Sequence, residues 1–189
     1  TMVAKTGFLR LTLVNHMLEN FHKAQGLTLF KFELTAGGAN HDAFIQEANS
    51  LTLGTTNITR TFDVLAANDI NDDGGAALNA TNLVLNSTSG SIGTSGTAIS
   101  TTVTNLTANA TASGQNVYIA ETNGLEITGA QGAGNIYSLT STTGNITNAT
   151  NTAADIITAP TVILSAGSGS IGTTTARVNV NTDNLSASA

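Results

Sequence analysis

The sequence lacks several residue types on which whole classes of protein depend. Its 189 residues include no cysteine, no tryptophan and a single proline, and only 10% are charged and 4% aromatic. Without cysteine there is no disulfide framework, no thiol nucleophile and no cysteine-based zinc site. No apolar run reaches the roughly 18 residues that a membrane-spanning helix needs, so the sequence predicts no membrane span.

Positive charge is especially scarce. Six lysine and arginine residues stand against twelve aspartate and glutamate residues, which gives a formal net charge of −6. Nucleic-acid binding needs clustered basic side chains to neutralise phosphate, so this composition excludes nucleic acid as a partner. Charge is also unevenly distributed, because the only charged residues after residue 75 are Glu121, Glu126, Asp155, Arg177 and Asp183.

What the chain has in abundance is threonine, asparagine and glycine, with 33, 21 and 19 residues. Valine, isoleucine and leucine supply most of its apolar side chains. Threonine, valine and isoleucine favour strands, and asparagine and glycine favour tight turns. The composition therefore predicts an all-β protein with many short strands.

Residues 1–49 differ from the rest of the chain and read as strand, helix and strand. Residues 7–13 and 27–34 have the pattern of short strands, and a loop is expected at 36–40. Between the strands, Val14, Met17, Leu18 and Phe21 have the spacing of one helix face, which predicts a helix ending near Gly26. We expect this α/β segment to serve as a cap or an assembly segment.

An internal repeat is the strongest feature of the remaining residues, 50–189. Residues 80–110 align without a gap with residues 159–189, at an offset of 79. The identical run is Ser89-Gly-Ser-Ile-Gly-Thr94 in the first copy and Ser168-Gly-Ser-Ile-Gly-Thr173 in the second. Self-similarity of this kind is typical of solenoids and related repeat architectures.

A shorter period lies inside the repeat. Aliphatic residues recur every seven positions, at Leu85, Ile92, Ile99 and Leu106, and again at Leu164, Ile171, Val178 and Leu185. The glycine, asparagine, serine and threonine between them are poor helix formers, which argues against a coiled coil. Three units of a short strand and a turn instead make a coil of about 20 residues, so we expect Leu85 to stack below Leu106 and Leu164 below Leu185.

The sequence thus predicts a parallel β-solenoid over residues 50–189, with about seven coils and the 79-residue offset equal to about four. The expected inward residues are Leu83, Leu85, Val117, Ile119, Leu125, Ile127, Ile136, Ile146, Ile156 or Ile157, Val162 and Leu164. The pattern stops at Ala189, whereas its counterpart Ala110 is followed by more of the repeat. This truncated end predicts a fragment of a longer protein, or a homo-oligomer or fibre joined through the solenoid ends.

Four segments resemble the rod repeats of filamentous haemagglutinin-type bacterial exoproteins and adhesins. They are Asp69-Ile-Asn-Asp-Asp-Gly-Gly75, Leu83-Val-Leu-Asn-Ser-Thr-Ser-Gly-Ser-Ile-Gly93, Leu106-Thr-Ala-Asn-Ala and Tyr137-Ser-Leu-Thr-Ser-Thr-Thr-Gly-Asn-Ile146. The resemblance covers roughly residues 50–189. It implies a right-handed parallel β-helix, an extracellular or bacterial cell-surface location and an adhesive or structural role. Residues 1–50 do not resemble the secretion domain of that family, because the chain has no Asn-Pro motif.

Few residues suggest catalysis or metal binding. Glu121 and Glu126 are the one carboxylate pair in the repeat region that a glycan-cleaving enzyme could use as acid and base. Beyond residue 75 no lysine, histidine or second arginine accompanies Arg177 to complete such a site. Asp69, Asn71, Asp73 and Gly74 match the start of a calcium-binding loop, but Ala80 stands where its bidentate glutamate belongs. The alternative interpretations are solvated surface carboxylates and an ordinary turn.

The other candidates are weaker still. His16 and His22 are six residues apart, which is not the helix spacing of a zinc pair. Thr102, Thr104 and Thr173–Thr175 do not recur at one place in each coil, as an ice-binding array requires. Glycosylation sequons, which chance also produces in such a composition, begin at Asn57, Asn79, Asn86, Asn105, Asn109, Asn145, Asn148 and Asn184.

The sequence therefore predicts no catalytic residue, metal site or cofactor. We expect a non-catalytic structural or adhesive module of a bacterial surface or extracellular fibre protein, with a surface glycan or a protein receptor as its partner. The alternative is a carbohydrate-active β-helix enzyme, a polysaccharide lyase or hydrolase.

Overall fold

The computed structural model describes residues 2–4, 9–13, 31–36, 41–75, 77–150 and 154–189, with side chains from His41 onward. Every regular element in it is a strand, and all eighteen strands belong to one parallel sheet that coils on itself. The strands are β1 (Met2–Ala4), β2 (Leu9–Leu13), β3 (Lys31–Ala36), β4 (Ala43–Glu47), β5 (Leu51–Asn57), β6 (Thr61–Ala66), β7 (Ile70–Asp72), β8 (Leu78–Ser87), β9 (Ile99–Ala110), β10 (Val117–Glu121), β11 (Leu125–Ile127), β12 (Gln131–Ala133), β13 (Ile136–Ser141), β14 (Ile146–Asn148), β15 (Ile156–Thr158), β16 (Thr161–Ala166), β17 (Asn179–Asn181) and β18 (Asn184–Ser188).

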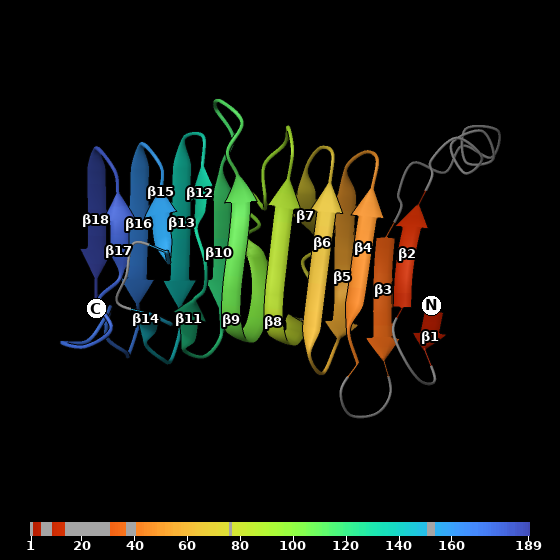
Figure 1. Cartoon of the computed structure of the whole chain (residues 1–189), viewed down its shortest axis with the longest axis horizontal. Helices are drawn as coiled ribbons and strands as arrows, with labels where there is room; N and C mark the ends of the chain where they lie inside the picture. Colours follow the sequence, from red (N-terminus) through yellow and green to blue (C-terminus); the bar gives the residue numbers. More distant parts are fainter. Residues whose placement is uncertain (1, 5–8, 14–30, 37–40, 76, 151–153) are drawn as a thin grey trace.

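The predicted β-solenoid is confirmed. The chain makes about seven stacked coils, and each strand pairs in parallel with the strand one coil later. In Figure 1 the near strands β4, β6 and β8 run upward and the far strands β5, β13 and β16 run downward, while the chain advances from right to left. This winding is right-handed, as is usual for connections between parallel strands.

The coils are not uniform in length. The coil that brings Ala43 beside Phe62 is shorter than the coil that brings Ile92 beside Val117. Part of the difference is a short loop at residues 93–98, closed by a hydrogen bond from the Thr94 amide to the Thr97 carbonyl (2.9 Å). This loop separates Ile92 from Ile99, so their seven-residue spacing does not mark one strand and one turn. The second copy of the repeat has the same loop at residues 172–177.

The predicted stacking of Leu85 below Leu106 is wrong. Leu106 pairs with Leu83, and Leu85 pairs with Ala108. Likewise Leu185 pairs with Val162 rather than with Leu164. The coil is two residues longer than the seven-residue period implies. Because side chains alternate between the two sides of a strand, a shift of two residues keeps the same side chains inside, and the hydrophobic pattern cannot detect it.

The two copies of the repeat are not separated by four whole coils either. Leu83 belongs to an inner column formed by Phe62, Leu83, Leu106 and Ile127. Its counterpart in the second copy, Val162, belongs to another column, formed by Ile92, Val117, Tyr137, Val162 and Leu185. Figure 1 shows β8 on the near side of the rod and β16 on the far side. An inward position in either column needs only an aliphatic or aromatic residue, so the same sequence motif can occur in both columns.

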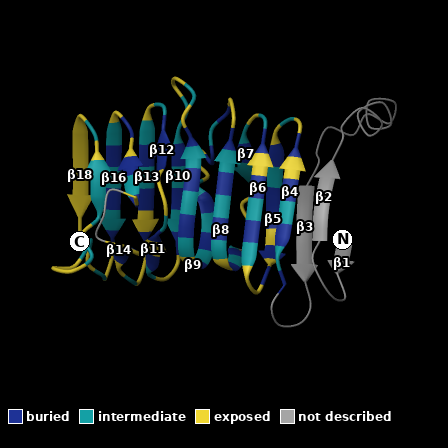
Figure 2. Cartoon of the chain, viewed as in Figure 1, coloured by how far each residue is buried: buried dark blue, intermediate teal, exposed yellow. Residues whose placement is uncertain are grey.

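The inner columns form one continuous apolar core, which Figure 2 shows as dark bands along the strands. The predicted inward residues are buried except Ile136, and Ile157 is the inward member of the pair Ile156 and Ile157. In place of Ile136 its neighbour Tyr137 faces inward, with no exposed surface. Tyr137 is accommodated because its hydroxyl donates a hydrogen bond to Oε1 of Gln131, whose Nε2 donates to the Leu106 carbonyl (3.0 Å). A buried phenol is costly without such a partner.

Glycine allows three successive corners to stack closely. Gly124, Gly144 and Gly169 lie above one another, where a Cβ on Gly144 would approach the Gly124 amide nitrogen to 2.2 Å. A Cβ on Gly169 would approach the Gly144 carbonyl oxygen to 2.1 Å. Because the neighbouring atoms are backbone atoms of an adjacent coil, no side chain can yield, and only glycine fits at these corners.

The two strands expected within the segment 1–49 agree with β2 and β3 where that segment is described. The helix predicted from Val14 to Gly26, and most of the loop at 36–40, lie outside the described residues. The parallel ladder continues into this segment, because β2 pairs with β4 and β4 pairs with β6. The division of the chain at residue 49 remains a prediction.

Candidate interaction surface on strands β4, β6 and β8

The structure separates the two glutamates considered as a catalytic pair. Glu121 ends β10 and is only 1% exposed. Its carboxylate accepts hydrogen bonds from the Thr101 hydroxyl (2.6 Å) and from the amides of Val103 (3.1 Å) and Asn123 (3.0 Å). Burial raises the pKa of Glu121, and these hydrogen bonds oppose the rise. Glu126 is exposed on the outer side of β11, so the two carboxylates do not share one surface.

The carboxylates of the calcium-loop candidate are bonded to backbone amides. Asp69 accepts from the Ser91 amide of the next coil (2.8 Å), and Asp73 accepts from the Gly75 amide (2.8 Å). Asp72 accepts from the Ser100 amide (2.7 Å). Within the described residues no group of three or more histidine, aspartate or glutamate side chains is placed to hold a metal ion. These contacts fit a turn that joins neighbouring coils.

The remaining candidates do not converge on one place. His16 and His22 lie outside the described residues. Thr102 and Thr104 lie on β9, whereas Thr173–Thr175 lie in the loop before Val178. Several of the sequon asparagines are buried or hydrogen-bonded to other residues of the chain. Asn105 donates to Asn82 (2.7 Å), Asn109 donates to Asn86 (3.1 Å), and Asn148 is only 1% exposed.

A surface that the sequence did not single out lies on the outer side of β4, β6 and β8. We call it the Asp63 face and define it by Phe44, Asp63, Leu65 and Val84. Strand register places Asp63 between Phe44 on β4 and Val84 on β8. Adjacent strands are about 4.8 Å apart, so both apolar side chains flank the carboxylate. Leu65, two residues further along β6, is 40% exposed, although most outward positions of the solenoid are polar.

Asp63 is the one half-buried carboxylate of this region that makes no hydrogen bond or ion pair with a described residue. Its apolar surroundings raise its pKa through loss of hydration. The nearby Asp42 is different, because it accepts from the Thr61 amide (3.0 Å) and forms an ion pair with Arg60 (3.4 Å). A carboxylate flanked by apolar side chains and left without a donor is unusual, since the lost hydration is not replaced.

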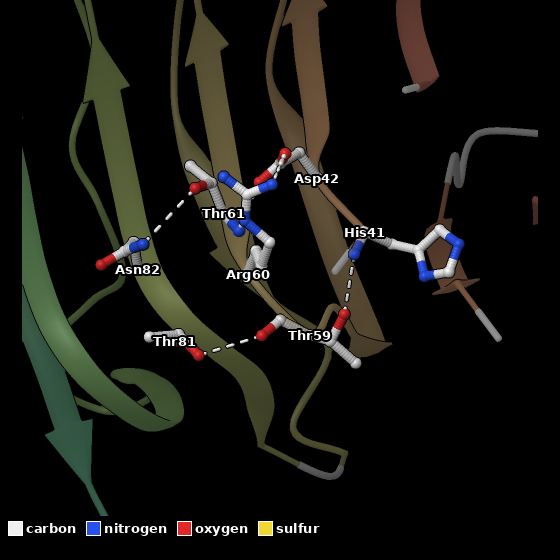
Figure 3. A network of polar contacts seen from close by, with 7 residues as sticks. All are labelled: His41, Asp42, Thr59, Arg60, Thr61, Thr81 and Asn82. Atoms are coloured by element: carbon white, nitrogen blue, oxygen red, sulfur yellow. Dashed lines mark hydrogen bonds and ion pairs between the residues drawn. The ribbon is translucent and has the colours of Figure 1, made fainter. Parts of the chain in front are cut away.

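Polar contacts border this face where β4 and β6 begin, beside Thr81 and Asn82 within β8 (Figure 3). Thr81 donates to the Thr59 carbonyl (2.9 Å), and the Thr59 hydroxyl accepts from the His41 amide (2.8 Å). Asn82 donates a long hydrogen bond to the Thr61 hydroxyl (3.5 Å). These contacts link three successive coils and hold the start of β6, and with it Asp63, in place.

The sequence contains only a faint signal for this face. Phe44 and Leu65 alternate with buried residues and so occupy outward positions, where the chain otherwise prefers threonine and asparagine. That pattern identifies two outward-facing apolar residues, of which Phe44 is partly buried and Leu65 exposed. It does not show that they meet around Asp63, because this depends on the lengths of two coils that differ from each other and from the coils of the repeat.

Comparison with protein-family models, with curated proteins and with solved structures finds no match to the chain. Across the described part of the chain, no helix has the length and apolar character needed to cross a membrane.

Proposed function

We propose that the chain is a non-catalytic structural module, a segment of a stiff rod in a bacterial surface or extracellular fibre protein with an adhesive or spacing role. The resemblance to rod repeats of filamentous haemagglutinin-type exoproteins motivates the location. The observation that carries the proposal is how the solenoid uses its outward polar side chains.

Outward asparagine and threonine side chains form hydrogen bonds to the neighbouring coil, which uses hydrogen-bonding groups that a ligand would otherwise contact. Asn105 and Asn109 donate to Asn82 and Asn86 one coil earlier, at 2.7 and 3.1 Å. The Thr107 hydroxyl bonds to the backbone of Thr128 in the following coil. Such ladders add contacts between neighbouring coils, and they suit a rod that must hold its shape.

The small number of charges fits the same role. A charged residue at one place in every coil would stack like charges about 4.8 Å apart, which is destabilising. Neutral asparagine, threonine and serine stack without this repulsion. An enzyme on the same scaffold needs exposed charged groups that converge on a substrate, and Glu121 and Glu126 are held on different sides of the sheet. This arrangement favours the structural module over the carbohydrate-active enzyme.

Incubation with a panel of acidic and neutral polysaccharides tests the proposal. We expect no new reducing ends and no unsaturated products, and electron microscopy of the purified chain should show short rods of constant width. Cleavage of any polysaccharide that is lost in a Glu126→Gln variant would establish the enzyme instead. A Glu19→Gln variant, which alters a glutamate outside the repeat region, is the control for a general effect of removing charge.

A further inference from the structure

We propose that the Asp63 face binds a protein partner through an arginine or lysine side chain that has apolar residues beside it. The proposal rests on the contacts of this face alone and stands apart from the structural role of the rod.

The need for a cation follows from the state of the other aspartates. Asp42, Asp69, Asp72 and Asp155 each accept hydrogen bonds from backbone amides of the chain. Asp63 has no such donor among the described residues, although Phe44 and Val84 remove part of its hydration. A carboxylate in this situation gains most from a cationic donor supplied from outside, because the cost of desolvation has already been met in the folded chain.

The described side chains do not supply that cation. Arg60 immediately precedes β6, but its guanidinium is paired with Asp42 at 3.4 Å. A bound metal ion is a poor fit, because calcium takes six to eight oxygen ligands and magnesium about six. The Asp63 face offers the Asp63 carboxylate between apolar neighbours.

The apolar neighbours indicate what carries the cation. Lysine and arginine have aliphatic stems that pack on apolar surfaces while the charged end reaches a polar group. Phe44 and Val84 provide such walls on both sides of Asp63. Leu65 lies two residues further along β6, about 7 Å away, which is also the spacing of residues i and i+2 in an extended peptide. An extended segment can therefore place a basic residue over Asp63 and an apolar residue over Leu65.

A peptide titration followed by nuclear magnetic resonance tests this inference on the full chain. The probe is acetyl-Leu-Thr-Arg-Thr-Leu-amide, and its control replaces arginine by citrulline, which keeps the shape and removes the charge. We expect saturable shifts in the backbone amide signals of Phe44, Asp63, Leu65 and Val84. The citrulline peptide should bind about tenfold more weakly or worse, since a charge-assisted hydrogen bond contributes at least that factor.

Two variants make the test specific. Asp63→Asn should weaken binding of the arginine peptide about tenfold or more, whereas Asp183→Asn, which alters an exposed aspartate near β18, should leave it unchanged. Asp63→Asn should also keep the melting temperature of the original protein or raise it, because Asp63 makes no hydrogen bond or ion pair with a described residue. Equal binding by Asp63→Asn, equal binding of the citrulline peptide, no binding, or shifts centred on another carboxylate would overturn the proposal. So would a lower melting temperature of Asp63→Asn.

Discussion

Replacement of Gly144 by alanine tests the stacking of the glycine corners. The added Cβ would lie 2.2 Å from the amide nitrogen and 2.5 Å from the Cα of Gly124, whereas ordinary contact begins at 3.4 Å. Relief of the overlap requires the two coils to separate locally by about 1 Å. Hydrogen bonds next to the corner would stretch, among them those from the Thr143 amide to the Thr122 carbonyl (3.1 Å) and from the Leu125 amide to the Asn145 carbonyl (2.9 Å).

Two or three weakened hydrogen bonds at about 1 kcal/mol each, together with residual overpacking, give an expected loss of about 2–4 kcal/mol in the free energy of unfolding. Gly96→Ala is the matched control. Gly96 lies in the loop at 93–98, and a Cβ there would meet nothing within 4 Å, so its effect should stay within about 0.5 kcal/mol.

Urea titrations followed by circular dichroism measure both variants. The chain has no tryptophan, so the β-sheet signal is the better probe of unfolding. Hydrogen exchange adds the location of the effect, which should be greatest in β11 and β14 because contacts in a solenoid are local. A midpoint for Gly144→Ala that equals the midpoint for Gly96→Ala would refute the reasoning.

Three further predictions concern the buried carboxylate, the outer ladder and the last coil. Glu121→Ala should lower the free energy of unfolding by about 2–4 kcal/mol, because three donors lose their acceptor, whereas Glu121→Gln should cost much less. The raised pKa of Glu121 means that the folded chain binds the proton of this carboxyl more tightly than the unfolded chain does. The contribution of Glu121 to the free energy of unfolding should therefore decrease as the pH rises above 4.5. Glu121→Gln should abolish this part of the pH dependence, as measured by urea unfolding. Asn105→Asp should lower the free energy of unfolding by about 1 kcal/mol at neutral pH, because it removes the donor to Asn82 and places a charge beside Glu126. Added salt should recover part of this loss. An equal loss at pH 3 would contradict the electrostatic cause. Leu185 pairs with Val162 but is 55% exposed on the last coil, so Leu185→Asp should lower the free energy of unfolding by only about 1 kcal/mol. It should reduce any concentration-dependent increase in mass seen by analytical ultracentrifugation, and an unchanged increase would argue against end-to-end assembly.

The architecture could be predicted from the sequence because it depends on composition and on a gapless repeat. The register could not. Leu83 and Leu85 both face inward, and only the true coil length decides which of them meets Leu106. The same limit explains Tyr137. Neighbouring apolar residues such as Ile136 and Tyr137 both fit an inward position, and the choice is made by Val117 and Val162 in the adjacent coils.

The Asp63 face was harder to predict for a related reason. Its residues come from three coils, at positions 44, 63 and 84, and no sequence period joins them. The glutamate pair shows the converse case. Glu121 and Glu126 are close in sequence, yet a corner of the solenoid turns one inward and the other outward. Proximity in the chain is therefore a weak guide to a shared surface in a coiled sheet.

The central claim is that the chain is a modular rod, and insertion of extra copies of one coil tests it most directly. The coil of residues 83–105 is suited to this because it contains no charged residue, so its copies stack without repulsion. Three extra copies inserted after Asn105 should lengthen the particle by about 14 Å at constant cross-section, as measured by small-angle X-ray scattering. A thicker particle, an unchanged length or an unfolded chain would contradict the claim.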